Sequence, residues 1–247
     1  ALRKLGVSNV ERALLARLKS EDAKVRTNVV RALASATSAA AIDGLIGALD
    51  DEDGGVRYQA AYALARKGEP AAKKKMLALL GEQRLNWVIG YYLRRVGGSA
   101  EAEMLIRLAE DPKSSDDVRR SAMYALRYLR TDEVRDFLVK HIKDASSPLR
   151  TEAIGVMASH RAPEALDVLI GALQDEDRTV RVRAAAALRG YYSPRTVEPL
   201  VKMMKAAKED YGEWNAAASA IYRIDDPAAV TPLIEGLSSE DARIRTR

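Results

Sequence analysis

The chain has 247 residues, of which 47% are hydrophobic and 30% are charged, and its formal net charge is +5. It has enough apolar material for a core, no run of the ~20 apolar residues that span a bilayer, and no dense basic tail of the kind that binds nucleic acid. It contains no cysteine, which excludes disulfides and thiol catalysis and favours a reducing compartment, so we expect a cytoplasmic protein.

A hydrophobic residue followed by arginine recurs along the chain at intervals of about 31 residues. The pairs are Val25-Arg26, Val56-Arg57, Val118-Arg119, Leu149-Arg150, Val180-Arg181 and Ile244-Arg245. Their spacings of 31, 62, 31, 31 and 64 residues indicate two units in which the pair is missing. Each pair begins an Ala-rich segment, and in the second unit Val56, Ala60 and Leu64 recur every four residues. This spacing predicts a helix that packs on one side, with small residues that let a neighbouring helix approach closely.

A second helical pattern precedes each pair. In the second unit its apolar residues follow the spacing i, i+3, i+4, i+7, which predicts an amphipathic helix; they are Ile42, Leu45, Ile46 and Leu49. An acidic turn joins the two helices, and an Asp lies at the N-cap position, three residues before the Val or Ile. These residues are Asp22, Asp53, Asp177 and Asp241. We expect the Arg of each pair to bridge to a neighbouring acidic turn, which would give a ladder along the stack.

Proline or glycine lies at several of the boundaries between two-helix units, because a helix must stop and restart there; these residues are Pro70, Gly97-Gly98, Pro163, Pro194 and Pro227. The seven predicted full units span residues 7–37, 38–69, 70–98, 99–131, 132–162, 163–193 and 194–226, with a partial unit at 227–247. Residues 1–6 match the close of a second helix, and the chain stops as another second helix begins. We therefore expect a single solenoid, with partial repeats at both ends, cut from the interior of a longer array.

The recurring pattern D-E-D-x-x-V-R-x-x-A-A-x-A-L resembles the HEAT-repeat family, in particular the short HEAT-like repeats of phycobilisome lyases. The resemblance covers the whole chain and implies an all-α fold, a right-handed α-α superhelix whose second helices line a concave side. Two units depart from the pattern, with Leu85-Asn86 in the third and Glu213-Trp214 in the seventh in place of the Val-Arg pair. We expect the ladder to be interrupted at both. Trp214 is interpreted as a packing replacement for the missing Arg or, alternatively, as an exposed anchor.

Residues that carry catalysis are nearly absent from the sequence. His141 and His160 lie in no His-Glu or His-x-x-x-His arrangement, so the ligand pairs of the HEAT-type di-iron hydroxylases have no match. No glycine-rich phosphate loop occurs, and the repeated Asp residues fit capping better than a single active site. We therefore predict a protein without enzymatic activity, metal or cofactor.

The second helices of units two to four carry aromatic residues at positions that the repeat leaves free. The exposed positions are expected to be the two residues after each pair, which include Val88 and Ser121, and the one three residues further on. Tyr62, Tyr91 and Tyr124 share that last position in three consecutive units. Together with two further aromatic residues and three arginines they form a candidate partner-binding strip, which comprises Tyr58, Tyr62, Trp87, Tyr91, Arg94, Arg120, Tyr124 and Arg127.

Tyr, Trp and Arg often carry the binding energy of interfaces, so the strip favours a protein-interaction scaffold that holds a peptide or partner helix on the concave face. Alternatively, the tyrosines fill space between helices around the small alanines. Nucleic-acid binding through Trp87, Arg94 and Arg127 is a second hypothesis, suggested by HEAT-like DNA glycosylases, although no acidic residue lies one turn from Trp87 on its helix. A non-catalytic subunit similar to a bilin lyase is the third.

Overall fold

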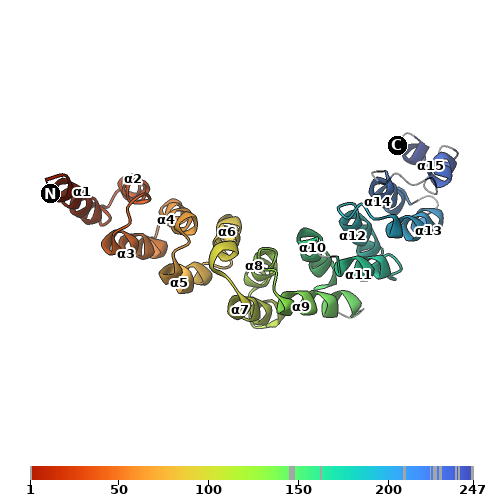
Figure 1. Ribbon diagram of the computed structural model, residues 1–247, viewed down its shortest axis with the longest axis horizontal. Coiled ribbons are helices and arrows are strands. Elements are labelled where there is room, and N and C mark those ends of the chain that lie inside the picture. Colours follow the sequence, from red (N-terminus) through yellow and green to blue (C-terminus); the bar gives the residue numbers. More distant parts are fainter. Residues whose placement is uncertain are drawn as a thin grey trace. The chain divides into compact units, whose positions relative to one another are not determined.

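The computed structural model describes residues 2–144, 148–161, 163–207, 210–222, 224, 227, 230–236, 238 and 240–245. Side chains are described from residue 9 onward within these ranges, except at 232 and 236. Every regular element in these ranges is helical, and first and second helices alternate along the chain (Figure 1). The all-α solenoid of helix pairs expected from the sequence is therefore confirmed.

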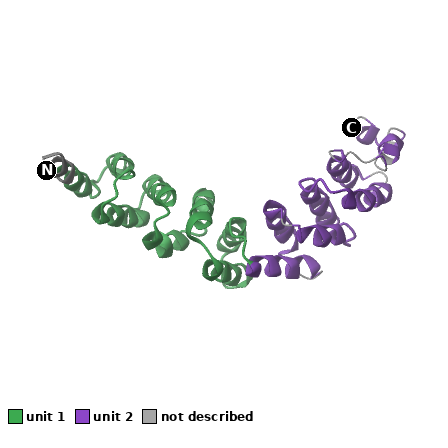
Figure 2. Cartoon of the chain, viewed as in Figure 1, with its two compact units in different colours: residues 1–131 green, residues 132–247 purple. Residues whose placement is uncertain are grey.

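The chain divides into two compact units, residues 1–131 and 132–247, here called unit 1 and unit 2 (Figure 2). The first helices of unit 1 are α1 (Leu2–Arg17), α3 (Ala39–Gly47), α5 (Lys73–Ala78) and α7 (Ser99–Glu110). Its second helices are α2 (Ala23–Leu33), α4 (Gly54–Lys67), α6 (Asn86–Val96) and α8 (Asp116–Leu126). Short 3-10 segments precede or follow some of these helices, namely η1 (Ala48–Asp50), η2 (Pro70–Ala72) and η3 (Gln83–Leu85). Residues 2–6, expected to close a preceding second helix, lie within α1.

Unit 2 repeats the same alternation. Its first helices are α9 (Asp132–Lys143), α11 (Ala165–Ala172), α13 (Val197–Ala207), which follows η4 (Pro194–Thr196), and α15 (Val230–Gly236). Its second helices are α10 (Arg150–His160), α12 (Arg178–Leu188), α14 (Tyr211–Ile221) and α16 (Ala242–Arg245). The predicted boundary between the seventh two-helix repeat and the final partial repeat includes residues 225, 226, 228 and 229, which lie outside the described residues.

Acidic side chains cap the second helices as predicted. The Asp53 carboxylate accepts hydrogen bonds from the backbone N–H groups of Gly55 at 2.8 Å and Val56 at 3.0 Å. Asp22 and Asp177 cap α2 and α12 in the same way, through the N–H groups two residues further on. Each cap satisfies backbone donors that the first helical turn leaves without a partner, so the acidic turn determines where the second helix begins.

The core lies between the first and second helices and uses the apolar stripe predicted for each. Val56, Ala60 and Leu64 of α4 are all 0% exposed, and so is Leu45 of α3. Small alanines at this contact let the helix axes lie close together, while the leucines fill the space between them. The repeat pattern is thus a description of the buried residues of each helix pair.

Arginine ladders join successive helix pairs within each unit. In unit 1, Arg26 donates to both carboxylate oxygens of Asp51, each at 2.8 Å, and Arg57 Nε donates to Glu82 at 3.0 Å. In unit 2, Arg150 contacts Asp175 at 3.2 Å and Arg181 Nε donates to Glu213 at 3.0 Å. Arg26, Arg57 and Arg181 each also donate to two carbonyl groups of the turn before their own helix. The predicted ladder is confirmed at Arg26 and Arg150, and it also continues into the third and seventh repeats through Glu82 and Glu213. Arg119, in contrast, contacts Asp116 of its own helix.

The two irregular repeats interrupt the ladder in different ways. In the third, Asn86 replaces the Arg and makes no ladder contact among the described residues. In the seventh, Trp214 replaces the Arg, while Glu213 is the acidic partner of Arg181 from the preceding repeat. Trp214, in the Arg position, is 6% exposed, which supports the packing interpretation and excludes an exposed anchor at this site.

Candidate partner-binding surface

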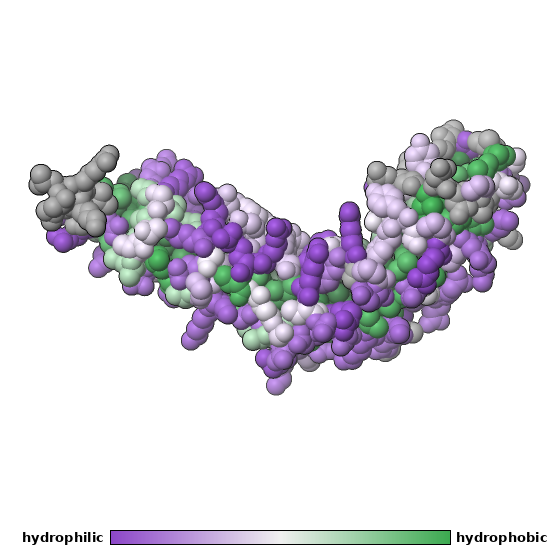
Figure 3. Space-filling view, viewed as in Figure 1, coloured by the Kyte–Doolittle hydropathy of each residue, from purple (hydrophilic) through white to green (hydrophobic). Residues whose placement is uncertain are grey.

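The strip lies on three neighbouring second helices of unit 1. Helix α4 packs against α6, and α6 packs against α8, so equivalent positions of the three helices lie side by side (Figure 1). The first helices pack against the opposite side of the row. Figure 3 shows a mostly hydrophilic surface in this view, with hydrophobic residues confined to smaller patches.

The aromatic residues of the strip are partly exposed. Trp87 is 41% exposed and Tyr62 is 36% exposed, and the other three tyrosines of the strip are half-buried. Tyr92, by contrast, is 0% exposed; its hydroxyl donates to the Glu69 carbonyl at 2.7 Å, and burial raises its pKa to about 12. Tyr92 therefore packs in the interior, whereas Trp87 and Tyr62 present their rings at the surface and the other three tyrosines of the strip are partly covered.

Trp87 joins two tyrosines into one aromatic platform across α4 and α6. The centroid of its ring lies 6.2 Å from that of Tyr58 and 5.7 Å from that of Tyr62, with the planes tilted by 55° and 53°. These are contact distances for tilted rings, which stabilise one another. The three rings thus form a single surface that a partner side chain can cover. We call Tyr58, Tyr62 and Trp87 the aromatic platform.

A second ring pair lies on α8 and the residues that follow it. Tyr124 and Tyr128 have centroids 5.9 Å apart, and their hydroxyl oxygens are 3.2 Å apart. Burial, assisted by the Tyr124 hydroxyl, raises the pKa of Tyr128 to about 12. Gly90 makes room for this ring, because a Cβ at that position would lie 2.1 Å from Tyr128 Cε2. Tyr128 was not predicted from the sequence as part of the strip. The available hint was Gly90, a small residue on α6 that leaves space for a ring from the neighbouring repeat. Tyr91 makes no ring contact with either group in the described part of the chain.

The three arginines of the strip differ in their surroundings. Arg120 is held by Asp117 at 2.7 Å, and the Gln83 amide donates to the same carboxylate at 3.3 Å. Arg120 first and then Gln83 lower the pKa of Asp117, so Arg120 belongs to an exposed ion pair within its own helix. Arg127 lies over the Tyr124 ring at 5.3 Å, and Arg94 is exposed.

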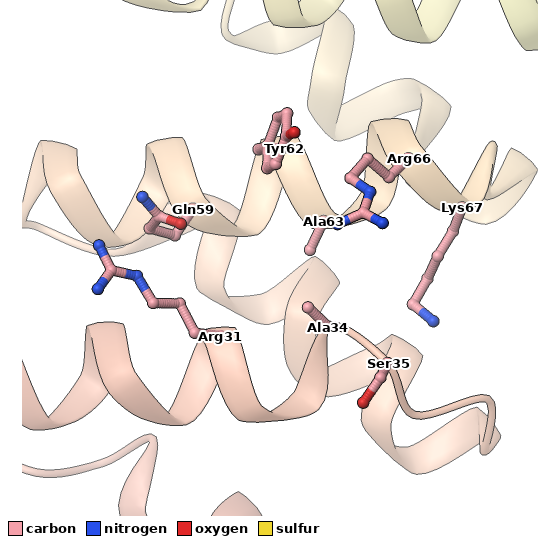
Figure 4. Close-up of a pocket in the computed structure, with 8 residues that line it drawn as sticks. All are labelled: Arg31, Ala34, Ser35, Gln59, Tyr62, Ala63, Arg66 and Lys67. Atoms are coloured by element: carbon pink, nitrogen blue, oxygen red, sulfur yellow. The ribbon is translucent and has the colours of Figure 1, made fainter.

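Two grooves border the aromatic platform. The first, of about 400 Å³, lies between α2 and α4; Arg31 and Gln59 are at one end, and Arg66 and Lys67 are at the other (Figure 4). The second, of about 500 Å³, lies between α6 and α8 and includes Trp87, Tyr124, Arg120 and Asp117. Tyr62 lines the first groove and Trp87 lines the second, so the platform contributes a ring to each groove.

Two residues expected at the surface are buried. Val88 is 0% exposed and Ser121 is 1% exposed, because this position faces the adjacent helix rather than solvent. Conversely, Arg31 occupies in α2 the position of Tyr62 in α4, and sequence reasoning missed it because it began with the aromatic residues. The common position six residues after the Val of each pair was a signal that would have found it.

The model of the family described as HEAT repeats matches residues 11–90, 136–213 and 172–247. The chain belongs to the HEAT-repeat family. A second model, the PBS lyase HEAT-like repeat, matches residues 118–144, in agreement with the resemblance seen in the sequence. A comparison with curated protein sequences finds no significant match.

Several solved structures resemble this chain at low sequence identity. YibA of Escherichia coli has 17% identity and a TM-score of 0.50, over 100% of this chain and 95% of that one. The complex of CpcE and CpcF of phycocyanin lyase from Nostoc sp. PCC7120 has 17% identity and a TM-score of 0.45, over 91% and 92%. Human deoxyhypusine hydroxylase has 18% identity and a TM-score of 0.41, over 99% and 95%. At these identities the likeness concerns the fold alone.

The described part of this HEAT-repeat chain holds no group of three or more His, Asp or Glu side chains placed to bind a metal ion. None of its described helices is long and apolar enough to cross a membrane. The geometry on the second helices of unit 1 consists of partly exposed rings, arginines and open grooves. Such a surface can bury apolar groups and pair with polar or charged ones.

Proposed function

We propose that this chain is a protein-interaction scaffold that binds a peptide or a partner helix on the second helices of unit 1 and has no catalytic activity of its own. The observation that carries the proposal is the aromatic platform, where Trp87 and Tyr62 are exposed by 41% and 36% on a largely polar surface. Tyr91, Tyr124 and the arginines of the strip extend the same surface towards α8.

The energetic argument rests on what these side chains gain when covered. A Tyr or Trp ring buries a large apolar area with few rotatable bonds, and its polar tip can still form a hydrogen bond. The contacts within the platform already restrict Trp87 between Tyr58 and Tyr62. Binding therefore orders few additional bonds, which lowers the entropic cost of association.

Nucleic-acid binding is the second candidate, favoured by the charge of unit 1. Residues 1–131 contain 23 Lys and Arg against 16 Asp and Glu, a net charge of +7. Arg94 and Arg127 would contact phosphate groups, while the platform would stack on bases. A role as a subunit of a bilin-lyase-like enzyme rests only on the repeat resemblance and on the match at residues 118–144.

A random peptide library displayed on phage tests the proposal. Peptides selected on the intact chain are measured against the double variant Tyr62→Ala/Trp87→Ala by fluorescence polarisation. We expect the double variant to lose about thirtyfold in affinity, equivalent to ~2 kcal/mol for the removal of a hot spot. Tyr222→Ala is the matched control, because Tyr222 is 83% exposed and belongs to unit 2.

The two tryptophans allow an independent readout. Trp214 is 6% exposed, so Trp214→Phe leaves Trp87 as the single indole reporter, and a bound peptide should shift its emission. Circular dichroism checks that each variant keeps its helices. Equal affinity for the wild type and for Tyr62→Ala/Trp87→Ala, with Trp87 emission unchanged by the peptide, would refute the proposed binding surface.

A further inference from the structure

The groove between α2 and α4 is lined by cations and by no acidic side chain. Arg31, Arg66 and Lys67 line it, together with the uncharged polar residues Gln59 and Ser35. Arg31 and Arg66 are exposed, and within the described residues neither forms an ion pair. The Lys67 ammonium group donates to the Ala36 carbonyl, which holds it at the end of the groove. A ligand that enters this groove meets positive charge at both ends.

The aromatic platform beside this groove is a cluster of rings in mutual contact rather than a cage for a cation. Its centroids lie 5.7 and 6.2 Å apart, so the tilted rings contact one another and leave no space between them for an ammonium group. The guanidinium of Arg66 already lies over the Tyr62 ring at 5.9 Å. A second cation here would be repelled, whereas an apolar side chain would gain contact with the rings.

The second groove argues against a nucleic-acid backbone along the same path. Asp117 lines this groove beside Arg120, and its side chain is 51% exposed. Phosphates along a single strand require a continuous basic track, and a carboxylate beside the platform breaks it. A polypeptide has no such requirement, because its acidic residues can be confined to one part of its length.

We propose that the partner is an acidic peptide segment whose carboxylates bind Arg31, Arg66 and Lys67 while an adjacent apolar side chain covers Tyr62 and Trp87. This inference rests on the proposed function and names the chemistry of its partner. Tyr62 links the two contacts, because it belongs to the platform and also lines the basic groove. Exposed pairs of this kind contribute modestly, so several carboxylates acting together set the preference.

Synthetic peptides with a central Leu-Phe pair test the inference. The pair is flanked on both sides by glutamates, by lysines or by glutamines, and a single-stranded oligothymidylate of similar length is the fourth probe. Affinities for the full chain are measured by fluorescence polarisation. We expect the glutamate peptide to bind about tenfold more tightly than the glutamine peptide, and the lysine peptide to bind most weakly. Raising NaCl from about 50 mM to about 0.5 M should remove most of this preference.

Variants separate the charge contact from the ring contact. Arg31→Gln/Arg66→Gln should remove the tenfold preference for glutamate and leave the glutamine peptide unaffected. Tyr62→Ala/Trp87→Ala should weaken both peptides. Arg183→Gln/Arg189→Gln is the matched control, since it removes two exposed arginines from the second helix α12 of unit 2, one of them at the helix end, and should change nothing.

Each outcome decides one of the two proposals. No preference for glutamate, a preference for lysine, or no measurable binding of the glutamate peptide up to about 1 mM overturns the inference. A preference that survives Arg31→Gln/Arg66→Gln also overturns it, and if Tyr62→Ala/Trp87→Ala still abolishes binding, the scaffold proposal stands. Tighter binding of oligothymidylate than of the glutamate peptide, lost with Arg31 and Arg66, assigns the surface to nucleic acid instead.

Discussion

Units 1 and 2 share one scaffold but present different residues from their second helices. The position of Tyr62, Tyr91 and Tyr124 in unit 1 is occupied in unit 2 by small residues, which are Gly155, Ala186 and Ser219. The core positions, in contrast, are the same in both units; Ala60, Leu64, Ala184 and Leu188 are all 1% exposed or less. The repeat pattern therefore prescribes buried residues and leaves the outer positions of the second helices free to differ.

The two units also differ in net charge. Unit 1 has a net charge of +7, whereas unit 2 has 17 Lys and Arg against 19 Asp and Glu, a net charge of −2. The ladder arginines are each paired with one or two carboxylates, so the ladders add no excess of positive charge. The excess positive charge of unit 1 thus lies outside the ladder, and part of it lines the groove beside the aromatic platform.

The largest expected effect concerns what the units share. Leu64→Ala in unit 1 and Leu188→Ala in unit 2 each remove a buried leucine from the same repeat position, and each should lower the free energy of unfolding by about 3 kcal/mol. Urea denaturation followed by circular dichroism measures both. A difference of more than about 1.5 kcal/mol between the two would show that the cores are not equivalent.

The second-largest expected effect is on stability, when one ladder arginine is removed from each unit. Glu213, the partner of Arg181, has a side chain 8% exposed, whereas Glu82, the partner of Arg57, is 37% exposed. Arg181→Ala leaves a buried carboxylate without its partner and should cost about 2 kcal/mol; Arg57→Ala should cost about 1 kcal/mol. Adding Glu213→Gln to Arg181→Ala should restore part of the loss. Equal costs for the two arginines in the same denaturation assay would contradict this account.

Glycines in equivalent helices provide a further contrast. A Cβ at Gly90 of α6 would lie within 2.8 Å of three atoms of the Tyr128 ring, whereas a Cβ at Gly155 of α10 meets nothing within 4 Å. Gly90→Ala should therefore destabilise by about 1.5 kcal/mol and expose Tyr128, while Gly155→Ala should be neutral or stabilising. Spectrophotometric titration should then show the Tyr128 pKa falling from about 12 towards 10. An unchanged titration in Gly90→Ala would mean that this glycine does not position the ring.

Acid should weaken both units through their paired carboxylates. Burial opposes ionisation of Asp51, but hydrogen bonds from Arg26 and from the Asp53 backbone N–H outweigh it and lower its pKa. Arg178, which donates to both oxygens of Asp210 at 2.6 and 2.7 Å, lowers the pKa of that group in unit 2. Since both pKa values are depressed on folding, the stabilisation is complete above the ordinary Asp pKa of about 4 and disappears as the pH falls below it.

The expected loss is a few degrees of Tm between pH 5 and about pH 3, measured by thermal circular dichroism. Arg26→Met and Arg178→Met should each have a flatter profile over this range, because the carboxylate then loses the main contact that lowers its pKa in the folded state. A profile as steep in both variants as in the wild type would assign the acid sensitivity to other carboxylates.

The fold could be predicted from the sequence because the residues that recur in the repeat are the ones that are buried. Val56, Ala60 and Leu64 identified a helix face, and Asp53 identified where that helix begins, since a cap and a stripe are local features. The ladder followed from the same spacing, except at Arg119, which contacts its own helix, and at Glu213, where an acidic residue took over a role that the pattern assigns to the preceding turn. That substitution is visible only when both helices are in place.

The surface was less predictable, because neighbours decide which free positions are exposed. Trp87 is exposed as expected, whereas Val88, next to it, is buried against an adjacent helix. Arg120 is exposed but already paired with Asp117 three residues earlier on the same helix, a contact that the i,i+3 spacing could have indicated. Tyr128 has room beside Tyr124 because Gly90, on another helix, has no side chain that would contact its ring.

The smallest expected effect is the one that bears most directly on function. Ala186→Tyr in unit 2 places a ring at the position of Tyr62, and because Ala186 is exposed, the free energy of unfolding should change by no more than about 0.5 kcal/mol. The reverse change, Tyr62→Ala, loses its contacts with Trp87 and Arg66 but gains helix propensity, and should be similarly small. Urea denaturation measures both. If the two exchanges are nearly neutral, stability does not explain why the rings are in unit 1, as the proposed binding role requires; a loss above about 1.5 kcal/mol for Tyr62→Ala would instead make the platform a structural feature.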